Sequence, residues 1–255
     1  MAVELGTRDE FAVLTLNRPE ALNALSFKII ADIGRAIDQV AKSKARALII
    51  TGAGTKAFCA GADIKELRHR DLSAQKRGAE LGQAVFSKLD TLPVASVAVI
   101  NGYAFGGGLE LALACTFRLA TKTAKVGLPE IKLGLVPGYG GTQRLPRVIG
   151  EARALEMIMT GRTVAAEEAE RIGLVNRIVE GDPIEAGMAF AREFTVYSLP
   201  VLGFARSAVQ RALDVPVQEG LKIEADLSTL AFQTKDAAEG TAAFEEKRRA
   251  SFVDG

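Results

Sequence analysis

The sequence predicts an α/β protein with a mainly parallel sheet and a largely helical C-terminal part. Two stretches in which an apolar strand is followed by an amphipathic helix predict the parallel sheet, because the helix returns the chain to start another strand in the same direction. Glycines are densest between residues 101 and 150, where an apolar strand leads into a helix. From Glu151 onward the apolar residues follow mainly helical periodicity.

The first strand–helix unit lies near the N-terminus. Residues 11–17 are rich in apolar side chains and predict a strand that stops at Arg18-Pro19. Apolar residues recur every three or four positions from Ser26 to about Lys42, which predicts a helix with Ser26 as its N-cap. The apolar run at residues 46–51 then predicts a buried strand that enters a glycine-rich loop.

The second unit consists of a polar helix at residues 72–89 and a continuous apolar strand at 94–100. The elements expected beyond it are a short strand at 174–179 and helices at 183–197, 200–213 and 217–232. We assign residues 1–195 to a core that contains the sheet and residues 196–255 to a C-terminal helical region.

Composition excludes several classes of protein. The 255 residues include 32 Lys plus Arg and 31 Asp plus Glu, a net charge of +1, so no overall field attracts nucleic acid or an anionic membrane. The longest apolar run, at residues 94–100, is far shorter than the ~20 residues of a membrane-spanning helix. Cys59 and Cys115 have no Cys or His close by in sequence, which indicates two small buried residues and neither a zinc site nor a disulfide. With no export signal visible, we expect a cytoplasmic location.

The first candidate site is the segment from Asn101 to Cys115, in which three glycines, 106–108, open an apolar helix. Glycines allow backbone N–H groups to face a ligand, and a helix N-terminus favours negative charge. Glu110 lies in the first turn between leucines, so burial is expected to raise its pKa. The structural alternative is a helix whose glycines permit close packing and whose glutamate complements the helix dipole.

The second candidate is Glu130, which follows Pro129 and precedes a Pro-Gly turn. A glutamate after a proline is common at the start of a short helix, so Glu130 alone indicates little. Together with Glu110 it is more informative, because two carboxylates beside glycine-rich segments can converge on one water molecule or one substrate carbon.

The third segment, residues 51–67, partly imitates a dinucleotide-binding fingerprint with Gly52-x-Gly54-x-x-Ala57. That fingerprint requires a helix at once, which Gly61 interrupts, and an acidic residue at the end of the next strand, whereas Asp71 lies in a polar stretch. We therefore favour a second group of backbone N–H donors at residues 60–63, ahead of a helix with Asp63 as its cap.

Three segments, at residues 60–65, 101–110 and 128–144, resemble the signature segments of the crotonase superfamily, and of enoyl-CoA hydratases in particular. The resemblance covers essentially the whole chain and extends to residues 17–25, 160–162, 173–176 and 244–252. It implies a ClpP/crotonase-like spiral of ββα units with a C-terminal helical trimerisation region. The expected assembly is a trimer or a hexamer formed as a dimer of trimers.

The resemblance also implies residue roles. The backbone N–H groups of Ala62 and Gly107 would form an oxyanion hole for the thioester carbonyl of a 2-enoyl-CoA. Ionised Glu110 would activate the water that attacks C3, and protonated Glu130 would deliver a proton to C2, giving a 3-hydroxyacyl-CoA. The N–H of Gly138 would help to place the water.

CoA binding in the family uses the segment that here contains Ala60, Ala62, Asp63, Ile64 and Lys65. Phe244 and Lys247 match positions through which a neighbouring subunit completes the CoA pocket, although both could simply end an amphipathic helix. Arg68 and Arg70 either face phosphates or belong to a solvated helix, and His69 is expected at the surface. CoA is part of the substrate, and no separate cofactor or metal is expected.

Three alternatives remain open from the sequence. An enoyl-CoA isomerase generally needs only one of the two carboxylates, and a dinucleotide-dependent oxidoreductase would use Gly52–Ala57. A non-catalytic, RNA-binding member would need a basic face, for which Lys247–Arg249 gives the only support. Thr116 and Val126 depart from the family pattern, which leaves the acyl-chain preference open.

Overall fold

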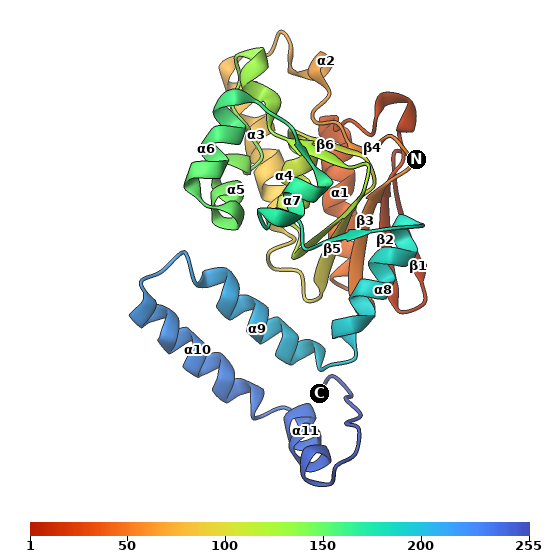
Figure 1. The fold of residues 1–255 in the computed structure, drawn as a ribbon, viewed down its shortest axis with the longest axis vertical. Helices are drawn as coiled ribbons and strands as arrows, with labels where there is room; N and C mark the ends of the chain where they lie inside the picture. Colours follow the sequence, from red (N-terminus) through yellow and green to blue (C-terminus); the bar gives the residue numbers. More distant parts are fainter. The chain divides into compact units, whose positions relative to one another are not determined.

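The computed structural model describes all residues, 1–255, as two compact units, Met1–Ala189 and Phe190–Gly255 (Figure 1). The boundary falls within helix α8 (Pro183–Thr195), which contributes its first half to the first unit. None of the helices has both the length and the apolar character that crossing a membrane requires.

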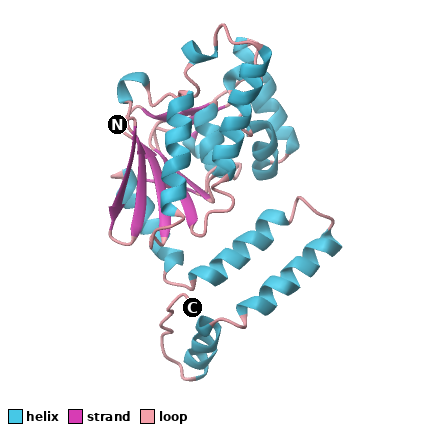
Figure 2. Cartoon of the chain, turned by 180° about the vertical axis from the view of Figure 1, so that it is seen from behind, coloured by secondary structure: helices cyan, strands magenta, loops and turns pink.

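The first unit is built on a six-stranded sheet with strand order β1-β2-β3-β5-β7-β10. Neighbouring strands are parallel except for the antiparallel β1–β2 pair, so the predicted mainly parallel sheet is confirmed. Figure 2 shows the strands of this unit gathered together with most of its helices to one side. The strands are β1 (Val3–Arg8), β2 (Phe11–Leu16), β3 (Ala47–Gly52), β5 (Ala95–Ile100), β7 (Phe117–Thr121) and β10 (Arg177–Val179).

Strands β3 and β5 form the centre of the sheet, and their apolar runs are buried on both faces. The hydroxyl of Thr51 donates to the carbonyl oxygen of Val99, so the polar residue in this layer is satisfied. A methyl group on Gly187 of α8 would lie 2.8 Å from methyl carbons of Ile49 and Val99, which shows how closely α8 packs on the sheet. Cys59 is likewise buried, as predicted, and burial raises the pKa of its thiol to about 12.

Helices α1 (Phe27–Val40) and α3 (Leu72–Ser87) pack against each other. Ser26 caps α1 as predicted, with its side chain accepting a hydrogen bond from the N–H of Ile29. Asp71 caps α3 in the same way through the N–H of Ala74. His69 is exposed, as expected, but it lies in a turn at φ +60° and not in a helix, because α2 (Ile64–Leu67) ends before it.

A second, four-stranded sheet of order β4-β6-β8-β9 escaped the sequence prediction. Its strands have only two or three residues each, too few for a period-two pattern to be recognised. They are β4 (Ala57–Cys59), β6 (Tyr103–Phe105), β8 (Lys125–Gly127) and β9 (Val164–Ala165). The remaining elements of this unit are η1 (Pro19–Ala21), α4 (Gly107–Ala114), η2 (Pro129–Leu133), α5 (Gly141–Ile149), α6 (Glu151–Thr160) and α7 (Ala166–Arg171).

The second unit contains α9 (Leu199–Arg211), α10 (Val217–Ala231) and α11 (Lys235–Glu245). Helices α9 and α10 contact each other and leave large apolar side chains exposed, namely Val209, Leu213, Val217, Leu221, Leu230 and Phe232. So much exposed apolar surface on one helical hairpin indicates a surface for association.

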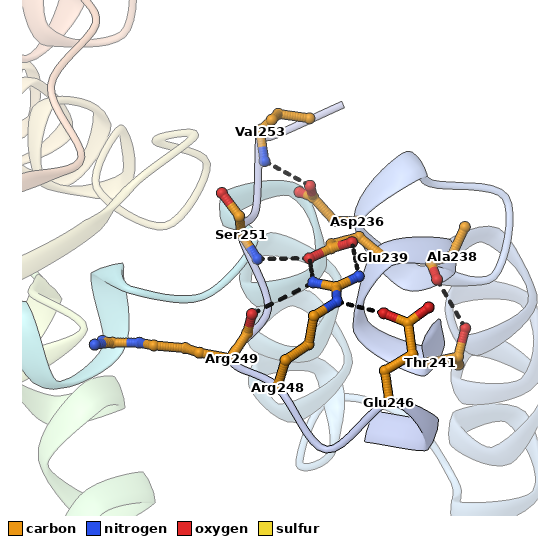
Figure 3. Close-up of polar contacts among 9 residues, drawn as sticks. All are labelled: Asp236, Ala238, Glu239, Thr241, Glu246, Arg248, Arg249, Ser251 and Val253. Atoms are coloured by element: carbon orange, nitrogen blue, oxygen red, sulfur yellow. Dashed lines mark hydrogen bonds and ion pairs between the residues drawn. The ribbon is translucent and has the colours of Figure 1, made fainter. Parts of the chain in front are cut away.

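The C-terminal tail is tied to α11 by a polar network (Figure 3). Buried Asp236 accepts hydrogen bonds from the backbone N–H groups of Val253 and Asp254. The two terminal guanidinium nitrogens of Arg248 donate hydrogen bonds to the two carboxylate oxygens of Glu239, which is a bidentate geometry. Hydrogen bonding from Arg248 lowers the pKa of Glu239 to about 2. The turn after α11 is therefore held in a defined position.

Candidate active site

Glu110 lies in the first turn of α4, a helix whose residues are all buried. Its side chain is 1% exposed. Carboxylate oxygen Oε1 accepts hydrogen bonds from the backbone N–H groups of Tyr139, at 2.7 Å, and Gly141, at 2.8 Å. A methyl group on Gly141 would lie 3.1 Å from the same oxygen, so glycine allows this close approach. The sequence prediction of a carboxylate in an apolar, glycine-rich setting is confirmed.

Burial raises the pKa of Glu110 from its ordinary value to about 7. The hydrogen bond from the N–H of Gly141 opposes this rise, and the nearby carboxyl of Glu130 adds to it. Backbone N–H groups can donate only to an unprotonated oxygen lone pair, and a carboxylate is the better acceptor. The hydrogen bonds thus favour the ionised form of Glu110, while burial makes it a base of useful strength near neutral pH.

Glu130 lies in the short helix η2, directly after Pro129. A methyl group on Gly106 would approach its Oε1 to 2.8 Å, which places this carboxyl beside the glycine-rich start of α4. Its other oxygen, Oε2, is buried without a hydrogen-bond partner, and burial raises the pKa of the group. A buried carboxyl oxygen with no donor favours the protonated form. The structure thus brings Glu110 and Glu130 into one site.

Two backbone N–H groups, those of Ala62 and Gly107, donate to no group of the chain. The residues on either side of Ala62 are both hydrogen-bonded to Leu25. The N–H of Leu25 donates to the carbonyl oxygen of Gly61, and the carbonyl oxygen of Leu25 accepts from the N–H of Asp63. Gly107 begins α4, where the N–H has no partner within the helix. A methyl group on Gly106 would lie 3.8 Å from the Cα atom of Gly61, so the turns that precede these N–H groups are adjacent.

Two buried asparagines hold the loop that leads to Ala62, and sequence reasoning missed both. Asn23 donates to the carbonyl oxygens of Ala53 and Ala57. Asn101 donates to those of Gly52 and Gly54. For Asn101 the signal in the sequence was its position directly after an apolar strand, where side-chain amides often satisfy loop carbonyls, whereas Asn23 follows η1 and carried no such signal.

Most of the other predicted site residues lie in loops of the first unit or in its short helix α2. Gly138 keeps its N–H free of partners within the chain, while its carbonyl oxygen accepts a hydrogen bond from Gln83. Asp63 caps α2 and pairs with Arg18 at 3.1 Å. Arg70 stacks on the ring of Phe27, with 4.1 Å between its guanidinium carbon and the ring centroid, which gives it a structural contact. Ala60 directly follows β4, and Ile64, Lys65 and Arg68 are exposed. In the second unit, Phe244 lies in the last turn of α11 and Lys247 follows that helix.

The dinucleotide-binding alternative has no structural support. The helix that the fingerprint requires after its glycines is replaced by strand β4. A methyl group on Gly52 would lie 2.4 Å from the carbonyl oxygens of Ala57 and Phe58, so this glycine serves close packing of the chain on itself.

Fold and site together define the class of protein: an α/β enzyme arranged for acid–base chemistry next to a carbonyl group. Partnerless N–H groups that follow two adjacent turns can stabilise a developing oxyanion. Two adjacent carboxyl groups, one favoured ionised and one favoured protonated, can move protons to and from the neighbouring carbon atoms.

Comparisons with known proteins identify the family. The family model described as enoyl-CoA hydratase/isomerase matches residues 6–255. The crotonyl-CoA hydratase of Syntrophomonas wolfei is 39% identical over 252 residues, 98% of this chain and 96% of that protein. The short-chain-enoyl-CoA hydratase of Clostridium acetobutylicum is 38% identical, over 97% and 95% of the two chains.

A solved structure gives the same result. The crystal structure of an enoyl-CoA hydratase from Bacillus anthracis superposes with a TM-score of 0.94 at 35% identity, over 100% of both chains. The chain belongs to the enoyl-CoA hydratase/isomerase family and has the crotonase fold, which confirms the resemblance seen in the sequence.

Proposed function

We propose that this protein is an enoyl-CoA hydratase, a hydro-lyase that adds water reversibly to a 2-enoyl-CoA and forms a 3-hydroxyacyl-CoA. The observation that carries the proposal is the pair of carboxyl groups, Glu110 and Glu130, beside the free N–H groups of Ala62 and Gly107. Family membership and relatives named as hydratases over nearly their whole length support it.

In the proposed mechanism, the N–H groups of Ala62 and Gly107 donate to the thioester carbonyl oxygen. Glu110 accepts one proton from water while the water oxygen bonds to C3, with the N–H of Gly138 helping to place the water. The electrons of the double bond pass to the carbonyl oxygen as an enolate, which the two N–H groups stabilise. The enolate then takes the proton of Glu130 at C2. Transfer of the proton from Glu110 back to Glu130 restores the site.

The first experiment is hydration of crotonyl-CoA. We expect the ultraviolet absorbance of the enoyl thioester to fall as 3-hydroxybutyryl-CoA forms, which chromatography identifies. An isomerase would instead convert a 3-enoyl-CoA to a 2-enoyl-CoA and leave crotonyl-CoA unhydrated. That outcome would replace the hydratase proposal, which rests on the presence of both carboxyl groups.

We further propose that the second unit forms the oligomer and completes the CoA site of a neighbouring subunit through Phe244 and Lys247. Phe244 is 86% exposed, and Lys247 directly precedes Arg248 in the chain. Figure 3 shows the pair between Arg248 and Glu239 that holds this turn. An exposed aromatic ring and an ammonium group suit an adenine base and a phosphate. Light scattering would test the expected trimeric or hexameric mass.

Replacing Lys247 by alanine should raise KM for crotonyl-CoA about two- to five-fold with kcat retained, because one exposed ion pair contributes up to ~1 kcal/mol. The same variant should hydrate a crotonyl thioester of N-acetylcysteamine normally, since that substrate lacks the nucleotide. Lys42→Ala, which removes an exposed lysine after α1, is the matched control. Equal KM for crotonyl-CoA in the wild type and Lys247→Ala would contradict the proposed contact.

The metabolic setting is also a proposal: degradation of fatty acids or of related acyl-CoA thioesters. A panel of enoyl-CoA substrates compared by kcat/KM would establish the acyl preference. The expected cytoplasmic location remains a prediction that cell fractionation would test.

A further inference from the structure

The loop between η2 and α5 determines how Glu110 is oriented. Its backbone N–H groups at Tyr139 and Gly141 supply the two hydrogen bonds to Glu110 Oε1. From Gly138 to Gly141 the only side chain is that of Tyr139, because the other three residues are glycines. Upstream, residues 131–136 are exposed and Pro137 is buried. The ring of Tyr139 is therefore the one side-chain anchor within the part of the loop that holds the carboxylate.

The ring of Tyr139 occupies a slot that glycines create. A methyl group on Gly82 would lie 2.2 Å from ring atom Cδ1, and one on Gly107 would lie 3.1 Å from Cδ2. Phe86 meets the ring edge-on, with 5.8 Å between centroids and an interplanar angle of 85°. The whole side chain is 7% exposed. Small residues on both sides and an aromatic edge contact fix the ring in one place.

Helix α3 supplies most of this slot. It carries Gly82 and Phe86, and its Gln83 side chain donates to the carbonyl oxygen of Gly138 at 2.9 Å. No hydrogen bond within the chain uses the hydroxyl group of Tyr139, so the ring acts through packing and the backbone through its N–H.

We propose that Tyr139 is a positioning residue, whose ring locks the loop onto α3 so that the N–H groups of Tyr139 and Gly141 hold Glu110 in the orientation needed to activate water. The role in catalysis rests on the proposed hydratase function. Other roles for the ring, as a core filler or as a wall of the acyl pocket, predict different changes in the kinetics.

Three variants test the positioning role with crotonyl-CoA. Tyr139→Ala removes the ring, and Gly82→Ala pushes it with a methyl group. We expect both to lower kcat at least about 10-fold with KM changed less than about three-fold, because a hydrogen bond to a charged group is worth ~1.5–3 kcal/mol. Tyr139→Phe keeps the ring and should recover the activity that Tyr139→Ala loses. Gly6→Ala, in edge strand β1 with no atom within 4 Å of the added methyl group, is the control for Gly82→Ala.

A double-variant cycle separates positioning of Glu110 from general damage. If Tyr139 acts through Glu110, the double variant Tyr139→Ala/Glu110→Gln should have a kcat less than about three-fold lower than that of Glu110→Gln alone. The proposal would be overturned if the fold-loss of kcat in the double variant equalled the product of the losses in the two single variants. It would also be overturned if Tyr139→Ala had the kcat of the wild type. A changed preference for longer acyl chains with kcat for crotonyl-CoA retained would identify a pocket wall instead.

Amide hydrogen exchange tests the anchor independently of the reaction. In Tyr139→Ala and Gly82→Ala, the peptide containing residues 137–141 should exchange faster than in the wild type, while peptides from β3 and β5 keep their protection. Unchanged exchange in residues 137–141 would overturn the anchor whether or not the protein hydrates crotonyl-CoA. Failure of the wild type to hydrate any enoyl-CoA, with faster exchange in the variants, would overturn the proposed function and not the anchor.

Discussion

Replacing Glu130 by glutamine should lower kcat for hydration of crotonyl-CoA by at least about 100-fold, which is typical of the loss of a general acid. Glutamine keeps the size of the side chain and a hydrogen-bond donor, but its amide cannot deliver a proton to C2. The buried, partnerless Oε2 atom of Glu130 is the position from which the proton would leave. Stopped-flow absorbance with saturating crotonyl-CoA measures the change directly.

The pH profile gives a second readout for the same variant. In the proposed mechanism Glu110 acts as the base and must be ionised. Because its pKa is raised to about 7, kcat/KM should fall as pH decreases below 7, far above the ordinary range of a glutamate. Because Glu130 is protonated in the proposed active form and glutamine is also neutral, Glu130→Gln should leave this acidic limb near its wild-type pH. In the wild type, ionisation of Glu130 should produce a fall on the alkaline side, which the variant lacks.

Glu151→Gln, at the exposed start of α6 in the first unit, is the matched control, and its kcat and pH profile should equal those of the wild type. A Glu130→Gln variant that turns over at the wild-type rate would exclude Glu130 as the acid. The arrangement would then resemble an enzyme that uses one carboxyl group, as expected for an isomerase.

The sequence was sufficient to predict the central sheet because β3 and β5 are continuous apolar runs, each connected to a clearly periodic or capped helix. It was insufficient for β1, which pairs only at the sheet edge and whose residues are half-buried or exposed, so its pattern carries little hydrophobic signal. The three-residue strands β4, β6 and β8 are specified by long-range pairing, which local propensity does not encode.

The same distinction applies to the site. Glu110 and Glu130 were predictable because each carboxyl group lies beside glycines in an apolar context, and that context is local in the sequence. The slot for Tyr139 was not predictable, because Gly82 lies on a polar helix far away in the sequence and has no distinguishing neighbour. A glycine required by tertiary contact looks like any other glycine until the contacting side chain is located.

Gly108→Ala should have the largest effect on stability. A methyl group on Gly108 would lie 2.0 Å from the carbonyl oxygen of Cys59 and 2.8 Å from its carbonyl carbon. Both contacts are with backbone, so no side chain can move aside, and α4 would have to shift away from β4. Overpacking of this kind exceeds the usual ~1–3 kcal/mol, and we expect Tm to fall by about 10 °C or more. Calorimetry or circular dichroism measures the change.

The activity of any Gly108→Ala protein that remains folded should fall further than its stability alone explains. Helix α4 carries Gly107 and Glu110, whereas β4 leads into the loop that presents Ala62, so moving α4 off β4 separates the two N–H groups that share one oxyanion in the proposed mechanism. Loss of one such donor typically costs about 100- to 1,000-fold in kcat. Gly6→Ala, in edge strand β1 with no atom within 4 Å of the added methyl group, should keep both Tm and kcat. A Gly108→Ala protein with unchanged Tm and kcat would show that the close approach of α4 to β4 is not what holds the oxyanion pair together.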